Sequence, residues 1–159
     1  MGAERHLKLV PTRVDTEPGQ IAREIAIDAP ADLVFSYFTD PSRHIRWQGV
    51  EAELDPRPGG HLRVTFAPGY VAVGTYIEVE PPTRLVYTWG WEQEGSDVLP
   101  PGATTVEVKL RPTERGTVVR VVHAGLPETM LQFHSHGWEE CLIELHASVG
   151  AAFETGHHR

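Results

Sequence analysis

His123 is the titratable side chain whose place in the sequence is best suited to chemistry. It shares an apolar, strand-like face with Val119 and Val121, because alternate residues of a strand point to the same side. An imidazole on such a face can orient a ligand carbonyl or act as an acid or a base near neutral pH. It can equally be a core histidine that hydrogen-bonds a neighbour, and no carboxylate in the sequence obviously orients it. We therefore place it on a ligand-binding surface and assign no catalytic residue.

Large aromatic side chains form the most suggestive set. Six of them fall on faces that periodicity places in the interior, namely Phe66, Tyr87, Trp89, Trp91, Phe133 and Trp138. Such rings can line a cavity and offer a broad apolar wall with an occasional N–H or O–H group, or they can simply fill the core. Tyr87 and Trp89 lie in mid-strand and are expected in the wall, whereas Trp47 and Trp91 are candidates for an entrance.

The nine histidines raise the question of a metal site. On a helix, His134 and His136 would point about 200° apart, so they cannot hold one ion together. His136 and Glu140, at positions i and i+4, could do so, but two ligands make a weak site. His157 and His158 fall in a polar C-terminal segment that is expected to be loose. The sequence thus predicts no metal and no cofactor.

Nucleophilic catalysis has little support in the sequence. There is no Gly-x-Ser-x-Gly motif, and the single cysteine, Cys141, falls in the middle of an apolar helical stripe, where a buried and inert thiol is expected. The glycine pair at 59–60 and the Pro-Gly pair at 68–69 are turns rather than phosphate-binding loops, since neither opens a helix after a strand.

A strand, two helices and a run of strands must position these residues. Residues 21–27 have a strand-like pattern, Pro30 suits the first turn of a helix through residues 33–38, and a second short helix is expected over residues 39–47. From Val50 the hydrophobic period changes to two, which predicts about six consecutive strands. The clearest of them cover residues 62–66, 71–79, 85–91, 106–110 and 118–124.

After residue 127 the period becomes helical. One stripe, spaced by three or four residues, contains Met130, Phe133, Gly137, Cys141, Leu145 and Val149. It is widened by Trp138, Leu142 and Ala152. The helix is expected to be about 20 residues long, longer than average, and to end near Gly150. Gly137 lies inside it at a cost of about 1 kcal/mol. It therefore either lets the helix approach the sheet or leaves room for a ligand.

This order of elements predicts a single α+β domain. A curved antiparallel β-sheet needs a cover on its apolar face, and the long C-terminal helix is the obvious one, with a space left between them. We divide the chain into an N-terminal extension (1–19), the domain (20–150) and a C-terminal tail (151–159).

Composition narrows the classes of function. The chain of 159 residues carries a net charge of −8, which disfavours binding to nucleic acids and to membrane surfaces. One cysteine excludes an intramolecular disulfide. The sequence has neither an apolar run of about 20 residues nor an N-terminal signal peptide, so we expect a cytoplasmic location.

Several short motifs resemble one known family. They occur in order along residues 21–149 and comprise Ala29-Pro30, Thr39-Asp40-Pro41, residues 55–60 (DPRPGG), residues 81–89 (PPTRLVYTW), residues 123–126 (HAGL) and Gly137-Trp138. The chain is similar to the heat-shock protein 90 ATPase activator homologue-like family of the START-like (SRPBCC) superfamily. This resemblance implies a helix-grip fold with an internal cavity, which relatives use for lipids, steroids, polyketides and other apolar ligands. The co-chaperone activators carry a further N-terminal domain with no counterpart here, so we expect no co-chaperone activity.

These observations predict a protein that binds an apolar small molecule of lipid, polyketide or aromatic type. The residues expected to line its cavity are Phe66, Tyr87, Trp89, Val108, Val121, His123, Phe133 and Cys141. One alternative is a cyclase or dehydratase of polyketide type that uses His123 with Tyr76 or Tyr87. Another is a regulatory partner of a chaperone or other protein, and an edge strand could make a homodimer.

Overall fold

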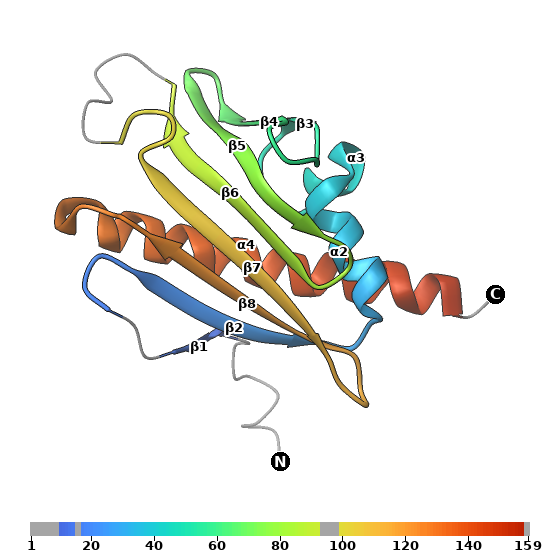
Figure 1. Cartoon of the computed structure of the whole chain (residues 1–159). Helices are drawn as coiled ribbons and strands as arrows, with labels where there is room; N and C mark the ends of the chain where they lie inside the picture. The colour runs from blue at the N-terminus through green and yellow to red at the C-terminus, as the bar shows by residue number, and fades with distance from the viewer. Residues whose placement is uncertain (1–9, 15–16, 93–98, 158–159) are drawn as a thin grey trace.

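The computed structural model describes residues 10–14, 17–92 and 99–157, with side chains up to residue 153. This description leaves out residues 1–9 of the expected extension and most of the loop after Glu92. It also leaves out the side chains of His157 and His158. In the described part, eight strands form one antiparallel sheet in the order β1-β2-β8-β7-β6-β5-β4-β3. Figure 1 shows this curved sheet with the long helix α4 running across one of its faces.

The order of elements along the chain confirms the expected run of six strands between the short helices and the long helix. They are β3 (Glu51–Leu54), β4 (His61–Ala67), β5 (Tyr70–Glu80), β6 (Arg84–Trp91), β7 (Thr104–Pro112) and β8 (Thr117–Ala124). The first strand, β2 (Ile21–Ile27), pairs with β8, and the short β1 (Thr12–Arg13) extends this edge within the expected extension. Along β6 and β8 every second side chain is buried, as the period of two predicts.

Two short helices follow β2, as expected. Helix α2 (Ala31–Thr39) buries Val34, Phe35 and Phe38, and α3 (Pro41–His44) is capped by Asp40, whose carboxylate accepts a hydrogen bond from the amide of Ser42. Helix α3 ends before Trp47, which was expected inside it.

The prediction that Trp47 lies at an entrance to the cavity is wrong. Its indole is buried, donates from Nε1 to the carbonyl of Tyr37 at 2.7 Å and packs on Phe38. It therefore ties the segment after α3 back onto α2.

Helix α4 (Glu128–His157) has 30 residues and is longer than periodicity predicts. It continues past Gly150 because Ala152 and Phe153 still pack against the core. Its buried stripe consists of His134, Trp138, Leu142, Leu145 and Val149. Trp138, Leu142, Leu145 and Val149 belong to the expected stripe, whereas His134 takes the interior place expected for Phe133. Phe133 is 58% exposed.

A buried ionic contact holds α4 to the sheet. Arg23 of β2 is only 6% exposed, and its Nε lies 3.0 Å from Oε2 of Glu139 on α4. The same guanidinium donates to Ser135 of α4 and to the carbonyl of Ala22. All of its branches are thus engaged, which fixes the distance between helix and edge strand.

Candidate functional site

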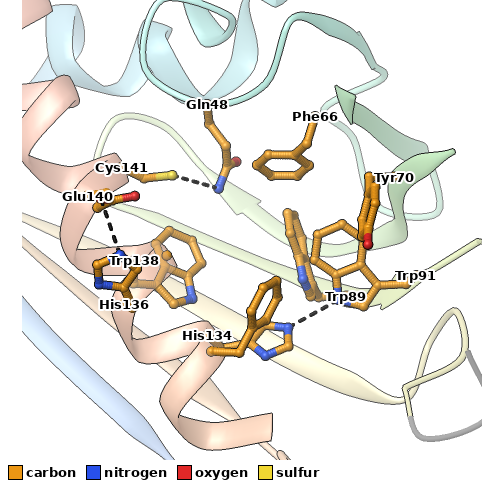
Figure 2. A pocket seen from close by; sticks show the side chains of 12 residues that line it. Gln48, Phe66, Tyr70, Trp89, Trp91, His134, His136, Trp138, Glu140 and Cys141 are labelled. Carbon is orange, nitrogen blue, oxygen red and sulfur yellow. Dashed lines mark hydrogen bonds and ion pairs between the residues drawn. The ribbon is translucent and has the colours of Figure 1, made fainter. Parts of the chain in front are cut away.

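A pocket of about 320 Å³ lies between α4 and the strands β4 to β6. The sheet side supplies Phe66, Tyr70, Trp89 and Trp91, and the helix side supplies Phe133, His134, His136, Gly137, Trp138, Glu140 and Cys141. Gln48, from the turn after α3, completes the lining. Figure 2 shows the aromatic rings of the sheet facing the side chains of α4. This volume is at the small end of the range for small-molecule sites.

The aromatic rings pack on one another in tilted and edge-to-face pairs. The rings of Trp89 and Trp91 are 5.8 Å apart at 83°, and Phe66 lies 6.1 Å from Trp89 and 5.4 Å from Trp91. Trp138 faces Trp89 at 6.4 Å from the helix side, and Phe133 lies 6.4 Å from Trp91. These are favourable geometries for aromatic pairs, so the wall is held in shape before any ligand arrives.

His134 fixes one of the tryptophans. Nε1 of Trp91 donates to Nε2 of His134 at 3.1 Å, while Nδ1 of His134 lies 2.9 Å from the carbonyl of Met130. Since an indole can only donate and a carbonyl can only accept, the proton of His134 resides on Nδ1. Burial lowers the pKa of His134, although the hydrogen bond to Met130 raises it in part. Nε2 of His134 therefore acts as an acceptor for Trp91 within the pocket lining.

His123 fixes a second tryptophan and lies behind the pocket. Trp138 donates from Nε1 to Nδ1 of His123 at 3.0 Å, so the proton of His123 resides on Nε2 and is given to Oγ1 of Thr104 at 2.8 Å. The hydroxyl of Thr104 donates onward to the carbonyl of Trp89 at 2.6 Å. Burial, together with the neighbouring His134, lowers the pKa of His123 to about 3. With 0% exposure and both nitrogens engaged, this is a structural core histidine.

Gln48 is a buried polar group at the inner end of the pocket. Its Oε1 accepts from Nε2 of His44 at 2.9 Å, which turns its Nε2 toward Sγ of Cys141, 3.9 Å away. Burial lowers the pKa of His44 to about 4 and raises that of the Cys141 thiol to about 11. Gly49 follows with φ +80°, where a Cβ would come within 2.5 Å of Val64, so only glycine allows this turn.

The rim of the pocket is more polar and exposed. His136 and Glu140 lie one turn apart on α4, with Nε2 and Oε2 separated by 3.2 Å, and both side chains are largely in solvent. Tyr70 and Phe133 stand at the opening, each more than half exposed.

Within the described residues no group of three or more histidine, cysteine, aspartate or glutamate side chains could hold a metal ion.

The structure brings four of the eight expected cavity residues to the pocket, namely Phe66, Trp89, Phe133 and Cys141. The other four, Tyr87, Val108, Val121 and His123, are buried in the core and do not line it. Val108 and Val121 belong to β7 and β8, whereas the pocket lies over β4 to β6. Tyr87 packs against Tyr76 at 6.0 Å, below the wall.

Sequence reasoning missed Gln48, Tyr70 and His134 as lining residues. A signal existed for His134, because it precedes Trp138 by four residues and therefore shares its helix face. No pattern indicates Gln48, which reaches the pocket only through the turn at Gly49.

The fold and the pocket define a helix-grip protein, an antiparallel sheet closed by a long C-terminal helix with a cavity between them. Residues 28–150 match the family described as "Activator of Hsp90 ATPase homolog 1-like protein", and the chain belongs to this family. This confirms the resemblance seen in the sequence.

Two solved structures and one curated relative illustrate the similarity. The AHSA1-like protein of Rhizobium etli is 39% identical with a TM-score of 0.66, over 82% of this chain and 81% of that one. CalU16 from Micromonospora echinospora is 30% identical with a TM-score of 0.69, over 91% and 89% of the two chains. An uncharacterized protein of Schizosaccharomyces pombe is 33% identical over 69 residues, 43% of this chain and only 20% of that protein. The chain therefore matches about a fifth of this relative's length.

In the described part of the chain, none of the helices combines the length and the apolar character needed to cross a membrane.

Proposed function

We propose that this protein binds a small, largely apolar ring compound in the pocket between α4 and the sheet, and releases it unchanged. The observation that carries the proposal is the preformed aromatic wall. Trp89, Trp91 and Trp138 surround an open space of about 320 Å³ that opens at Tyr70 and Phe133. Burying a flat ring against such a wall is favourable at about 25 cal/mol for each Å² of apolar surface removed from water.

Gly137 supports a role of the pocket in holding a ligand. A Cβ built on Gly137 would meet nothing within 4 Å, so close approach of the helix to the sheet does not require glycine there. Of the two explanations from the sequence, space beside the pocket is the one this geometry favours.

The ionisable groups around the pocket favour binding over catalysis. Both nitrogens of His134 are engaged by Trp91 and Met130, and the Cys141 thiol is held in its protonated form by burial. A general acid or base must reach the substrate and change its protonation state near neutral pH. The cyclase alternative relied on His123 with Tyr76 or Tyr87, and all three are buried away from the pocket, with the pKa of each phenol raised by burial.

A regulatory role through the outer face of the sheet has less support. That face carries ion pairs such as Arg84 with Glu107 and Arg120 with Glu24 rather than a continuous apolar patch in the described residues. Docking surfaces on proteins usually combine an apolar centre with a polar rim.

Gly137→Leu tests the proposal by filling the pocket. The new side chain enters open space, so it should block the pocket without displacing the wall. We expect wild-type protein to bind 2-naphthylmethanol in isothermal titration calorimetry and the variant to lose at least tenfold in affinity. Gly150→Leu is the matched control, because Gly150 also lies in α4 with open space at its Cβ but does not line the pocket. It should bind like wild type.

Recovery of the bound compound separates binding from turnover. Naphthylmethanol extracted after prolonged incubation and examined by mass spectrometry should have its original mass. Equal affinity of both glycine variants would place binding elsewhere, and a changed mass would favour the enzyme alternative.

A further inference from the structure

We propose that the pocket selects ligands that carry a positive charge, such as aromatic ammonium compounds, over neutral and anionic molecules of the same shape. The inference rests on the proposed function and names the chemical class of its ligand. Three independent features of the pocket support it: the orientation of its indoles, the charges of its lining, and the kind of donors it offers.

Two of the three indoles of the pocket have their positive N–H groups engaged by imidazoles. Trp91 donates to His134, which itself lines the pocket, and Trp138 donates to the buried His123. Because the ring edge is the positive part of an aromatic system and the face is the negative part, engaging these N–H groups favours contact of a ligand with the negative faces. Tryptophan is the best of the aromatic side chains at attracting a cation in this way.

The lining carries a negative charge without a fixed positive one. Glu140 contributes a carboxylate at the rim, and none of the residues found to line the pocket is lysine or arginine. Burial lowers the pKa of His134, which favours its uncharged form. His136 lies beside Glu140, with its Nε2 3.2 Å from Oε2, and both side chains are largely in solvent. The net charge of −8 for the whole chain acts in the same direction.

The donors of the pocket residues do not suit an anion. Nε2 of Gln48 has only the thiol of Cys141 as a distant partner, whereas Nε1 of Trp89 is buried and has no hydrogen-bond partner in the described structure. The single amide dipole of Gln48 fits an ether or carbonyl oxygen on the ligand. It does not offset the loss of water around a full negative charge, for which a buried site needs a paired cation.

Three naphthalene compounds of nearly equal shape test the charge preference directly. They are 2-naphthylmethylammonium, 2-naphthylmethanol and 2-naphthylacetate, titrated calorimetrically at about pH 8. We expect the ammonium to bind about tenfold more tightly than the alcohol, and the acetate about tenfold more weakly than the alcohol.

Glu140→Gln separates the carboxylate from the rings. This substitution should reduce the preference for the ammonium over the alcohol about threefold, measured as the ratio of the two affinities in each variant. Glu114→Gln is the matched control, since it removes the same charge from an exposed turn that does not line the pocket, and it should change neither affinity.

The outcomes distinguish this inference from the proposed function. Equal or tighter binding of the alcohol, or tightest binding of the acetate, would overturn the charge preference while leaving a functional ligand pocket. Absence of binding by all three compounds would overturn both. A preference for the ammonium that Glu140→Gln and Glu114→Gln reduce equally would mean that the overall charge of the protein acts, and not the pocket.

Discussion

Two buried histidines act as supports for tryptophans. His134 accepts a hydrogen bond from Trp91, and His123 accepts one from Trp138. With its other nitrogen each imidazole donates to an oxygen, the carbonyl of Met130 for His134 and the hydroxyl of Thr104 for His123. Such a fully satisfied polar contact inside a core fixes the orientation of both partners. His123, the histidine that looks most suited to chemistry in the sequence, thus shapes the pocket without lining it.

The contacts predict opposite tautomers for these two residues. His123 should carry its proton on Nε2 and His134 on Nδ1, because each other nitrogen receives an indole N–H. His123 should also remain neutral at about pH 6, because burial lowers its pKa to about 3. Long-range ¹H–¹⁵N correlation spectra of the imidazole rings measure the tautomers and the charge. Identical tautomers, or a charged His123 at this pH, would contradict the described network.

The sequence predicts individual side chains of the site where a strand dictates their direction. Phe66 and Trp89 follow from the period of two, although the pairing of β4 with β5 shifts its register between Thr65 and Ala67, at Phe66. His123 also follows as an interior residue, but alternation cannot tell a core position from a cavity wall. That difference depends on how far α4 stands from each strand, which depends on packing between elements distant in sequence. Packing between distant elements also brings Gln48 to the pocket, so the sequence pattern does not predict it.

At the scale of the elements, α4 is held over the sheet by contacts at its edges as well as by its apolar stripe. Arg23 and Glu139 join β2 to α4, and Ser148 of α4 donates to the carbonyl of Arg46 after α3. The contact at Glu139 lies within the part of α4 that lines the pocket, and the contact at Ser148 lies about two and a half turns further along the helix.

Glu139→Gln should therefore destabilise the protein by about 2 kcal/mol, because it leaves the buried guanidinium of Arg23 without its counter-ion. The loss of stability is smaller than for a fully buried ion pair because Glu139 is partly exposed. Urea unfolding followed by circular dichroism measures the change. Asp55→Asn is the control, since it breaks the largely exposed pair with Arg57 and should cost less than about 0.5 kcal/mol. Equal effects of the two substitutions would show that the Arg23 contact is not a buried clamp.

The order and type of the elements could be predicted from the sequence, whereas the end and rotation of α4 could not. Turn residues and a period of two locate the strands, since both depend on neighbouring residues. The helix continues past Gly150 because Ala152 and Phe153 find contacts on the core, and such contacts are not visible in the helical period. Its rotation places His134 rather than Phe133 inside, because the imidazole there finds two partners.

At the scale of the whole molecule, buried neutral histidines link stability to pH. His44, His123 and His134 all have a pKa below the ordinary value because burial penalises the charged ring. In the unfolded chain these side chains are exposed and take up protons below about pH 6.5.

Stability should consequently fall as the pH is lowered from about 7.5 to 5. In this window the unfolded state binds protons that the folded state does not bind. The reason is that the pKa is about 4 for folded His44 and about 3 for folded His123. Each of the two should cost about 2 kcal/mol of the free energy of unfolding at pH 5, and the effect disappears above the unfolded pKa. Urea unfolding at both pH values measures it. His123→Asn keeps an acceptor for Trp138 and should reduce the pH dependence by the share that His123 contributes. Constant stability across the window would mean that these rings can be protonated in the folded state, and the aromatic wall would then lack the fixed acceptors on which the proposed ligand preference depends.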